Sequence, residues 1–87
     1  MKTSITSLRN INHEAGMWLL GVGCRTVEQL KEEGVVDVYK RCKAKYPDKV
    51  SVNLLWALQA GLYDMPGNEL PDDTKQALLL QLDERRI

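Results

Sequence analysis

The segment 52–58, with the sequence VNLLWAL, is apolar on nearly every helical face and limits the possible folds more than any other feature. Ser51 precedes it and is a residue type that often caps a helix N-terminus. A helix without a polar side needs cover all round, because none of its faces prefers water. We therefore expect a central helix from Ser51 to about Leu62 that other helices surround, with Trp56 as its large core residue.

Length and composition are those of a small globular protein. The chain has 87 residues, which suits one domain, and we expect that domain to span 1–87 with residues 1–10 as a short N-terminal arm. Hydrophobic residues make up 44% and charged residues 28%, as is ordinary for soluble proteins. The 12 basic and 12 acidic residues balance, which disfavours a protein that coats nucleic acid, since such proteins are usually basic overall.

Capping residues and glycines mark further helices, and no alternating strand pattern competes with them. A first helix is expected over 13–20, with Asn12 as its N-cap and a Gly-Val-Gly turn as its end. Thr26 and Gln29 have the spacing of a capping box and start a second helix, which Gly34 ends.

Two prolines delimit the remaining helices. A third helix is expected over 35–45 and stops before Pro47, because proline disfavours helical geometry in the preceding residue. Pro71 suits the first turn of a last helix. The expected fold class is all-α, a compact bundle of about five short helices around the central one. Its core residues share apolar side chains at inward positions: Trp18, Leu30, Tyr39, Leu54, Leu55, Trp56, Leu58, Leu78 and Leu82.

The chain offers few ligands for a metal or cofactor. Cys24, Cys42 and His13 are too few for a structural zinc site, which takes four nitrogen or sulfur ligands. Their count leaves a disulfide open, but free thiols in a cytoplasmic protein are the expectation. Residues 1–7 lack the apolar core of a signal peptide, and the longest fully apolar run, 54–58, is too short to cross a bilayer. We expect no metal, no cofactor and no membrane contact.

One basic cluster stands out, and its five members lie between positions 40 and 49: Lys40, Arg41, Lys43, Lys45 and Lys49. Such a patch can bind the phosphates of a nucleic acid. The same pattern also describes the solvated side of an amphipathic helix, and this is the interpretation we favour, because basic faces alone are a weak signature.

The turn from Gly21 to Gly23 has the Gly-hydrophobic-Gly form of a helix-hairpin-helix loop. Backbone N–H groups at such a turn and the next helix start can bind a DNA phosphate. A plain helix stop followed by a tight turn explains the same residues. We favour the plain stop, since Thr26 already caps the second helix.

The remaining candidates do not form a catalytic set. Trp18 could stack on a ligand, but it shares a helical face with apolar neighbours. His13 and Glu14 could act as an acid–base pair, yet no nucleophile, metal set or phosphate loop accompanies them. We therefore expect no enzymatic activity, no catalytic residues and no small-molecule substrate.

The sequence resembles the C-terminal domain of the TfoX/Sxy family of bacterial competence regulators over roughly residues 7–84. The most specific matching block is 50–58. The other matching residues are Leu8, Asn10, Val22, Gly23, 26–30, Gly34, Val35, Val38, Tyr39, Lys43, Leu70 and Pro71.

The resemblance implies an all-α fold of the helix-hairpin-helix or SAM-like kind. It also implies a role in transcriptional regulation of DNA-uptake genes, in some members alongside the cyclic-AMP receptor protein. The family favours a Gly-Pro pair where this chain has Asn12-His13 after Asn10-Ile11. Regulatory members usually carry an additional N-terminal domain, and we expect this chain to be a stand-alone C-terminal domain.

Two functional hypotheses follow. The first is a non-enzymatic regulatory domain that binds a protein partner or itself, which the zero net charge favours. The alternative is a DNA-contacting regulator that uses the basic cluster and the glycine turn, with weak binding expected.

Overall fold

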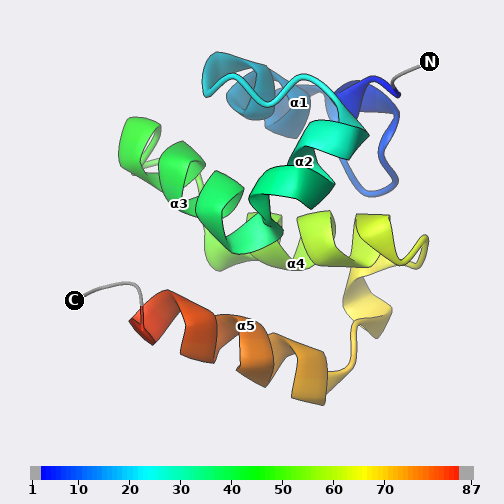
Figure 1. The fold of residues 1–87 in the computed structure, drawn as a ribbon, viewed down its shortest axis with the longest axis vertical. Helices are drawn as coiled ribbons and strands as arrows, with labels where there is room; N and C mark the ends of the chain where they lie inside the picture. The colour runs from blue at the N-terminus through cyan, green and yellow to red at the C-terminus, as the bar shows by residue number, and fades with distance from the viewer. Residues whose placement is uncertain (1–2, 85–87) are drawn as a thin grey trace.

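Five α-helices and two short 3-10 helices follow one another in the computed structural model, which describes residues 3–84 (Figure 1). No β-strand occurs within this range, and a single isolated bridge joins Ser4 to Thr26. The all-α prediction is therefore confirmed. In chain order the elements are η1 (Ile5–Ser7), α1 (His13–Gly21), α2 (Val27–Glu33), α3 (Val35–Lys45), α4 (Val52–Leu62), η2 (Gly67–Glu69) and α5 (Asp72–Glu84).

Side-chain caps set the starts of three helices. Asn12 accepts the Ala15 N–H at 2.8 Å at the start of α1. Thr26 accepts the Gln29 N–H at 3.0 Å at the start of α2. Ser51 caps α4 in the same way, so each cap satisfies a backbone donor that would otherwise lack a partner in the first turn.

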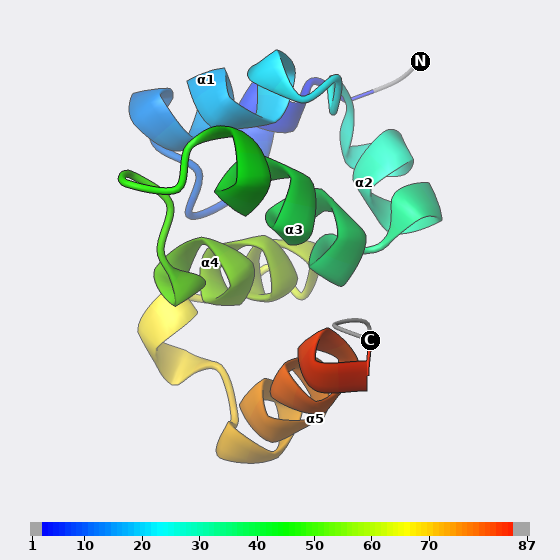
Figure 2. The ribbon, with the colours of Figure 1, turned by 90° about the vertical axis from the view of Figure 1, so that its left-hand side faces the viewer.

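The helix α4 runs through the middle of the molecule, with α3 on one side and α5 along the outer edge (Figures 1 and 2). Leu55 and Leu58 of α4 are fully buried, and Leu54 is nearly so. The expected central helix is thus present. Among the described residues, α1, α2 and α3 lie on one side of α4 and α5 lies on the other (Figure 1).

The predicted core residues divide into two groups. Trp18, Trp56 and Leu82 are half-buried and pack against the core from its margin, so placing Trp56 at the centre of the core was wrong. The Trp56 ring has the Lys75 ammonium 5.7 Å from its centroid, which is a cation–π contact between α4 and α5. The buried group comprises Leu30, Tyr39, Leu54, Leu55, Leu58 and Leu78.

The N-terminal arm is part of the packed structure. Ile5 is fully buried and Leu8 nearly so. The Ile5 N–H donates to the Arg25 carbonyl at 2.9 Å, and the Val27 N–H donates to the Thr3 carbonyl at 2.8 Å. The arm therefore joins the start of α2 by backbone hydrogen bonds, which no local pattern in residues 1–10 indicates.

The end of the arm also touches the chain after α4. The Asn10 side chain donates to the Met65 carbonyl at 2.8 Å, and Arg9 lies 3.7 Å from the Asp64 carboxylate. Gly61 makes this contact sterically feasible. A Cβ at Gly61 would lie 2.6 Å from the Arg9 carbonyl oxygen and 2.8 Å from Leu8 Cγ, so a side chain there has no room.

No helix in the range 3–84 combines the length and the apolar character needed to cross a bilayer.

Candidate interaction surface

Lys43 of the basic cluster is used to close the connection between α3 and α4. Its ammonium donates to the Pro47 carbonyl at 3.0 Å and to the Val50 carbonyl at 2.6 Å. These two bonds replace water at carbonyl groups that follow the end of α3. Lys43 is therefore a structural residue as well as a charged one.

Lys45 joins two features that the sequence suggested separately. Its ammonium donates to the Gly21 carbonyl at 2.7 Å, at the C-terminus of α1. A cation at this position complements the negative end of the helix dipole. The same ammonium lies 5.7 Å from the centroid of the Tyr46 ring. The basic cluster and the glycine turn thus contact each other.

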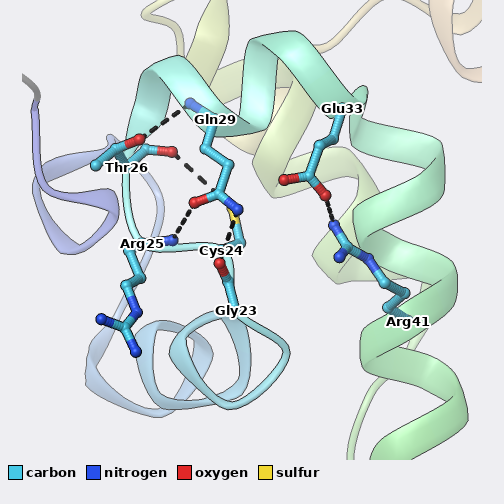
Figure 3. Close-up of polar contacts among 7 residues, drawn as sticks. All are labelled: Gly23, Cys24, Arg25, Thr26, Gln29, Glu33 and Arg41. Carbon is cyan, nitrogen blue, oxygen red and sulfur yellow. Dashed lines mark hydrogen bonds and ion pairs between the residues drawn. The ribbon is translucent and has the colours of Figure 1, made fainter.

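The other members of the cluster point to different places. Arg41 forms an ion pair with Glu33 at the end of α2 (Figure 3). Lys40 is half-buried and has an electrostatic or hydrogen-bonding partner of its own. Lys49 is exposed in the α3–α4 loop, where its backbone N–H donates to the Tyr46 carbonyl at 3.1 Å, and its side chain forms no hydrogen bond or ion pair with the residues that the structure describes. The five residues do not present one open face of free cations.

The turn after α1 is a helix C-cap whose N–H groups already have acceptors. The Gly23 N–H donates to the Leu20 carbonyl at 3.1 Å, and the Cys24 N–H donates to the Leu19 carbonyl at 2.9 Å. This pair of bonds is the Schellman arrangement, in which the residue at the Gly23 position is left-handed. Gly23 has φ of +85°, which explains the glycine there.

Side chains close the start of α2 in the same manner (Figure 3). The Gln29 amide oxygen accepts the Arg25 N–H at 3.0 Å, and its nitrogen donates to the Gly23 carbonyl at 2.8 Å. The Thr3 N–H donates to Glu28 at 2.7 Å, and this bond lowers the pKa of the Glu28 carboxyl. A carboxylate at the helix start repels phosphate, and the N–H groups of Gly23, Cys24 and Arg25 already have acceptors, so the turn lacks the free donors of an anion site.

An apolar groove lies between α3 and α5 and was not anticipated from the sequence. It has a volume of about 620 Å³, and the start of α4 contributes to its wall. Leu79 of α5, which is 37% exposed, belongs to this wall. The groove is lined by Tyr39, Lys40, Lys43, Ala44, Val52, Leu79 and Leu82.

The two cysteines are inert rather than catalytic. Cys24 and Cys42 are free thiols with no exposed surface. Burial raises the pKa of both thiols, that of Cys42 to about 11, where the neighbouring Cys24 adds to the effect. A protonated, inaccessible thiol is a poor nucleophile and a poor metal ligand. His13 is exposed at the start of α1, whereas both cysteines are buried.

No group of three or more His, Cys, Asp or Glu side chains in the described range could hold a metal ion. The contacts around Lys43, Lys45 and Gln29 are structural, and the groove is the feature with unoccupied apolar surface. What the arrangement offers chemically is therefore an apolar binding surface with two lysines on its wall.

Comparison with known proteins gives one match. The family model of the TfoX C-terminal domain matches residues 1–82, which is nearly the whole chain. No curated protein sequence and no solved structure matches.

Proposed function

Because the chain belongs to the TfoX C-terminal domain family, we propose that it is a non-enzymatic regulatory domain that binds protein and does not grip DNA. The proposal includes a helix-hairpin-helix or SAM-like arrangement of its helices and a cytoplasmic location. It also includes a part in the transcriptional regulation of competence, which the family resemblance suggests.

One observation carries this proposal: the groups that would hold phosphate are engaged inside the fold. Lys43 and Lys45 bind backbone carbonyls, and Arg41 binds Glu33. Turning Lys43 toward a phosphate would leave two carbonyls without their partner. The contact with the Val50 carbonyl is part-buried, and an unsatisfied buried acceptor costs up to roughly 1–3 kcal/mol, whereas the exposed Pro47 carbonyl can accept from water instead.

The glycine turn supports the same conclusion. Its N–H groups at Gly23 and Cys24 donate within the α1 C-cap, and the N–H groups of Arg25 and Val27 donate to Gln29 and Thr3. A helix-hairpin-helix loop needs such donors free to reach phosphate oxygens. The interaction that remains available to this domain is burial of apolar surface against a partner.

The test is a titration of a short random DNA duplex, followed by fluorescence anisotropy at physiological salt. We expect a dissociation constant weaker than about 100 μM, the weak end of non-specific binding. The opposite result would be tight binding with a log–log salt slope near −4.5, from about −0.9 for each of five phosphate contacts.

The variants for this titration follow from the contacts. Lys43→Glu is unsuitable, because it would break the α3–α4 connection as well as reverse a charge. Lys49→Glu reverses an exposed member of the cluster whose side chain holds no part of the fold together, and Lys31→Glu on α2 is its matched control. Tight binding that Lys49→Glu weakens and Lys31→Glu leaves intact would overturn the proposal in favour of a DNA-contacting domain.

A further inference from the structure

Beside the groove between α3 and α5, the helix α5 carries an exposed apolar ridge formed by Leu79 and Leu80. Leu78 of α5 is buried, whereas Leu79 is 37% and Leu80 is 62% exposed. Successive residues on a helix are about 100° apart, so Leu80 points away from the side that Leu78 buries. Val52, at the α4 end of the groove, is 36% exposed. This edge of the molecule therefore has apolar surface on both the groove and the ridge.

The charges of the two helices are complementary. The helix α3 (Val35–Lys45) has four basic residues, of which Arg41 pairs with Glu33 and Lys45 binds the Gly21 carbonyl, so Lys40 and Lys43 supply the positive charge at the groove. The helix α5 (Asp72–Glu84) has four acidic residues and one lysine, a net charge of −3. Lys40 and Lys43 line the groove, and Asp72 and Asp73 are exposed at the first turn of α5. The internal bonds of Lys43 go to neutral carbonyls, so its charge is retained.

We infer that the groove receives α5 of a second copy of this chain, in a symmetric dimer. This inference rests on the proposed function and names the partner. An isologous interface requires one patch that carries both complementary parts, and here the basic-walled groove and the acidic apolar helix are adjacent. Leu79 belongs to the groove wall and to the exposed side of α5, so its two copies meet near the twofold axis.

A second apolar patch gives the rival location and the control. Met17 and Leu20 on α1 are 56% and 43% exposed beside a smaller hollow of about 260 Å³. That hollow is lined by neutral residues and His13 and lacks the opposed charges of the α3–α5 edge. Charge complementarity therefore selects the α3–α5 groove over the α1 patch.

The first test is sedimentation analysis of the full chain between about 10 μM and 1 mM, the range in which small interfaces associate. The unmodified chain is expected to dimerise. Leu79→Lys should weaken dimerisation by at least about 100-fold, since each dimer loses two buried leucines and gains two like charges at its centre. Met17→Lys, with the same change on α1, should leave the dimer intact.

The second test detects the dimer by cross-linking, so it does not depend on a variant that weakens the interface. Leu79→Cys should form an intermolecular disulfide with oxidised glutathione, which takes up the two electrons, because the two thiols face each other across the axis. Met17→Cys should stay monomeric in the same reaction. The native Cys24 and Cys42 have no exposed surface, so they should not form disulfides in this reaction.

The outcomes separate cleanly. A monomer at 1 mM, or a dimer that Met17→Lys disrupts and Leu79→Lys does not, would overturn the inference. If Leu79→Lys lowers the helix content, Leu80→Lys at the more exposed position takes its place. The DNA titration is independent of these results. A chain that stays monomeric and does not bind DNA would therefore refute the dimer alone and leave the protein-binding proposal standing.

Discussion

Replacing Gly61 with alanine would set two opposing effects against each other at the contact between α4 and the N-terminal arm. Alanine is favoured over glycine inside a helix by about 1 kcal/mol. Against this gain stands the arm, because the new Cβ would lie 2.6 Å from the Arg9 carbonyl oxygen and 2.8 Å from Leu8 Cγ. The first neighbour is backbone and cannot rotate away, so the arm itself must shift.

The magnitude follows from what that shift would break. Overpacking of this kind costs roughly 1–3 kcal/mol. The value should lie near the upper end, since displacement of the arm also strains the bonds from Asn10 to Met65 and from Arg9 to Asp64. After the helical gain is subtracted, Gly61→Ala should destabilise the fold by roughly 1–2 kcal/mol. For a chain of this length that lowers the melting temperature by about 5–12 °C.

Gly16 supplies a matched control for the measurement. It is also buried within a helix, but a Cβ there would lie 3.1 Å from Thr6 Cγ2, which is part of an exposed side chain that can move. Gly16→Ala should therefore stay within about 0.5 kcal/mol of the parent, because the helical gain and a small clash nearly cancel. Chemical and thermal unfolding followed by circular dichroism measures both variants. If Gly61→Ala is as stable as Gly16→Ala, the close approach of the arm to α4 does not exist in solution.

Two further predictions concern the core. Leu55→Ala should cost about 2.7–5 kcal/mol, and Trp56→Ala should cost less despite its larger side chain, because Leu55 is fully buried and Trp56 only half; equal or reversed losses in urea unfolding would contradict the burial pattern. Burial raises the pKa of the Cys42 thiol from 9.0 to about 11, so the native state holds this proton more tightly than the unfolded chain does. The contribution of this group to the free energy of unfolding should be fully present below about pH 9 and should be lost, by about 1–3 kcal/mol, as the pH rises towards 11. Cys42→Ala should reduce this loss of stability, and an unchanged alkaline decline in the variant would refute the assignment.

The helix boundaries were predictable because their causes are local. Asn12, Thr26 and Ser51 each accept an N–H from two or three residues ahead, and such short-range geometry is encoded in sequence spacing. Gly34 ends α2 with φ of +91°, a conformation that other residues rarely adopt. Signals of this range need no knowledge of the tertiary structure.

The roles of the side chains were less predictable because they depend on distant partners. Lys45 binds a carbonyl 24 positions earlier, and Asn10 binds one 55 positions later. Hydrophobicity alone placed Trp56 at the centre of the core, but its burial depends on how much of α4 the helix α5 covers. The apolar groove likewise exists only once α3 and α5 lie side by side, so no single segment indicates it.

The position of the N-terminal arm has a consequence for synthesis on the ribosome. The arm precedes α4 in the chain, yet the contacts of Arg9 and Asn10 with residues 64 and 65 cannot form until the chain beyond α4 has been made. At about 5–20 residues per second, the 55 intervening residues take roughly 3–11 s. During that interval the arm can already bond to the start of α2 through Ile5 and Thr3, whereas Leu8 still lacks its neighbour Gly61 on α4. The arm thus reaches its native place in two stages, first against the start of α2 and later, once residues 64 and 65 have been made, against the chain after α4.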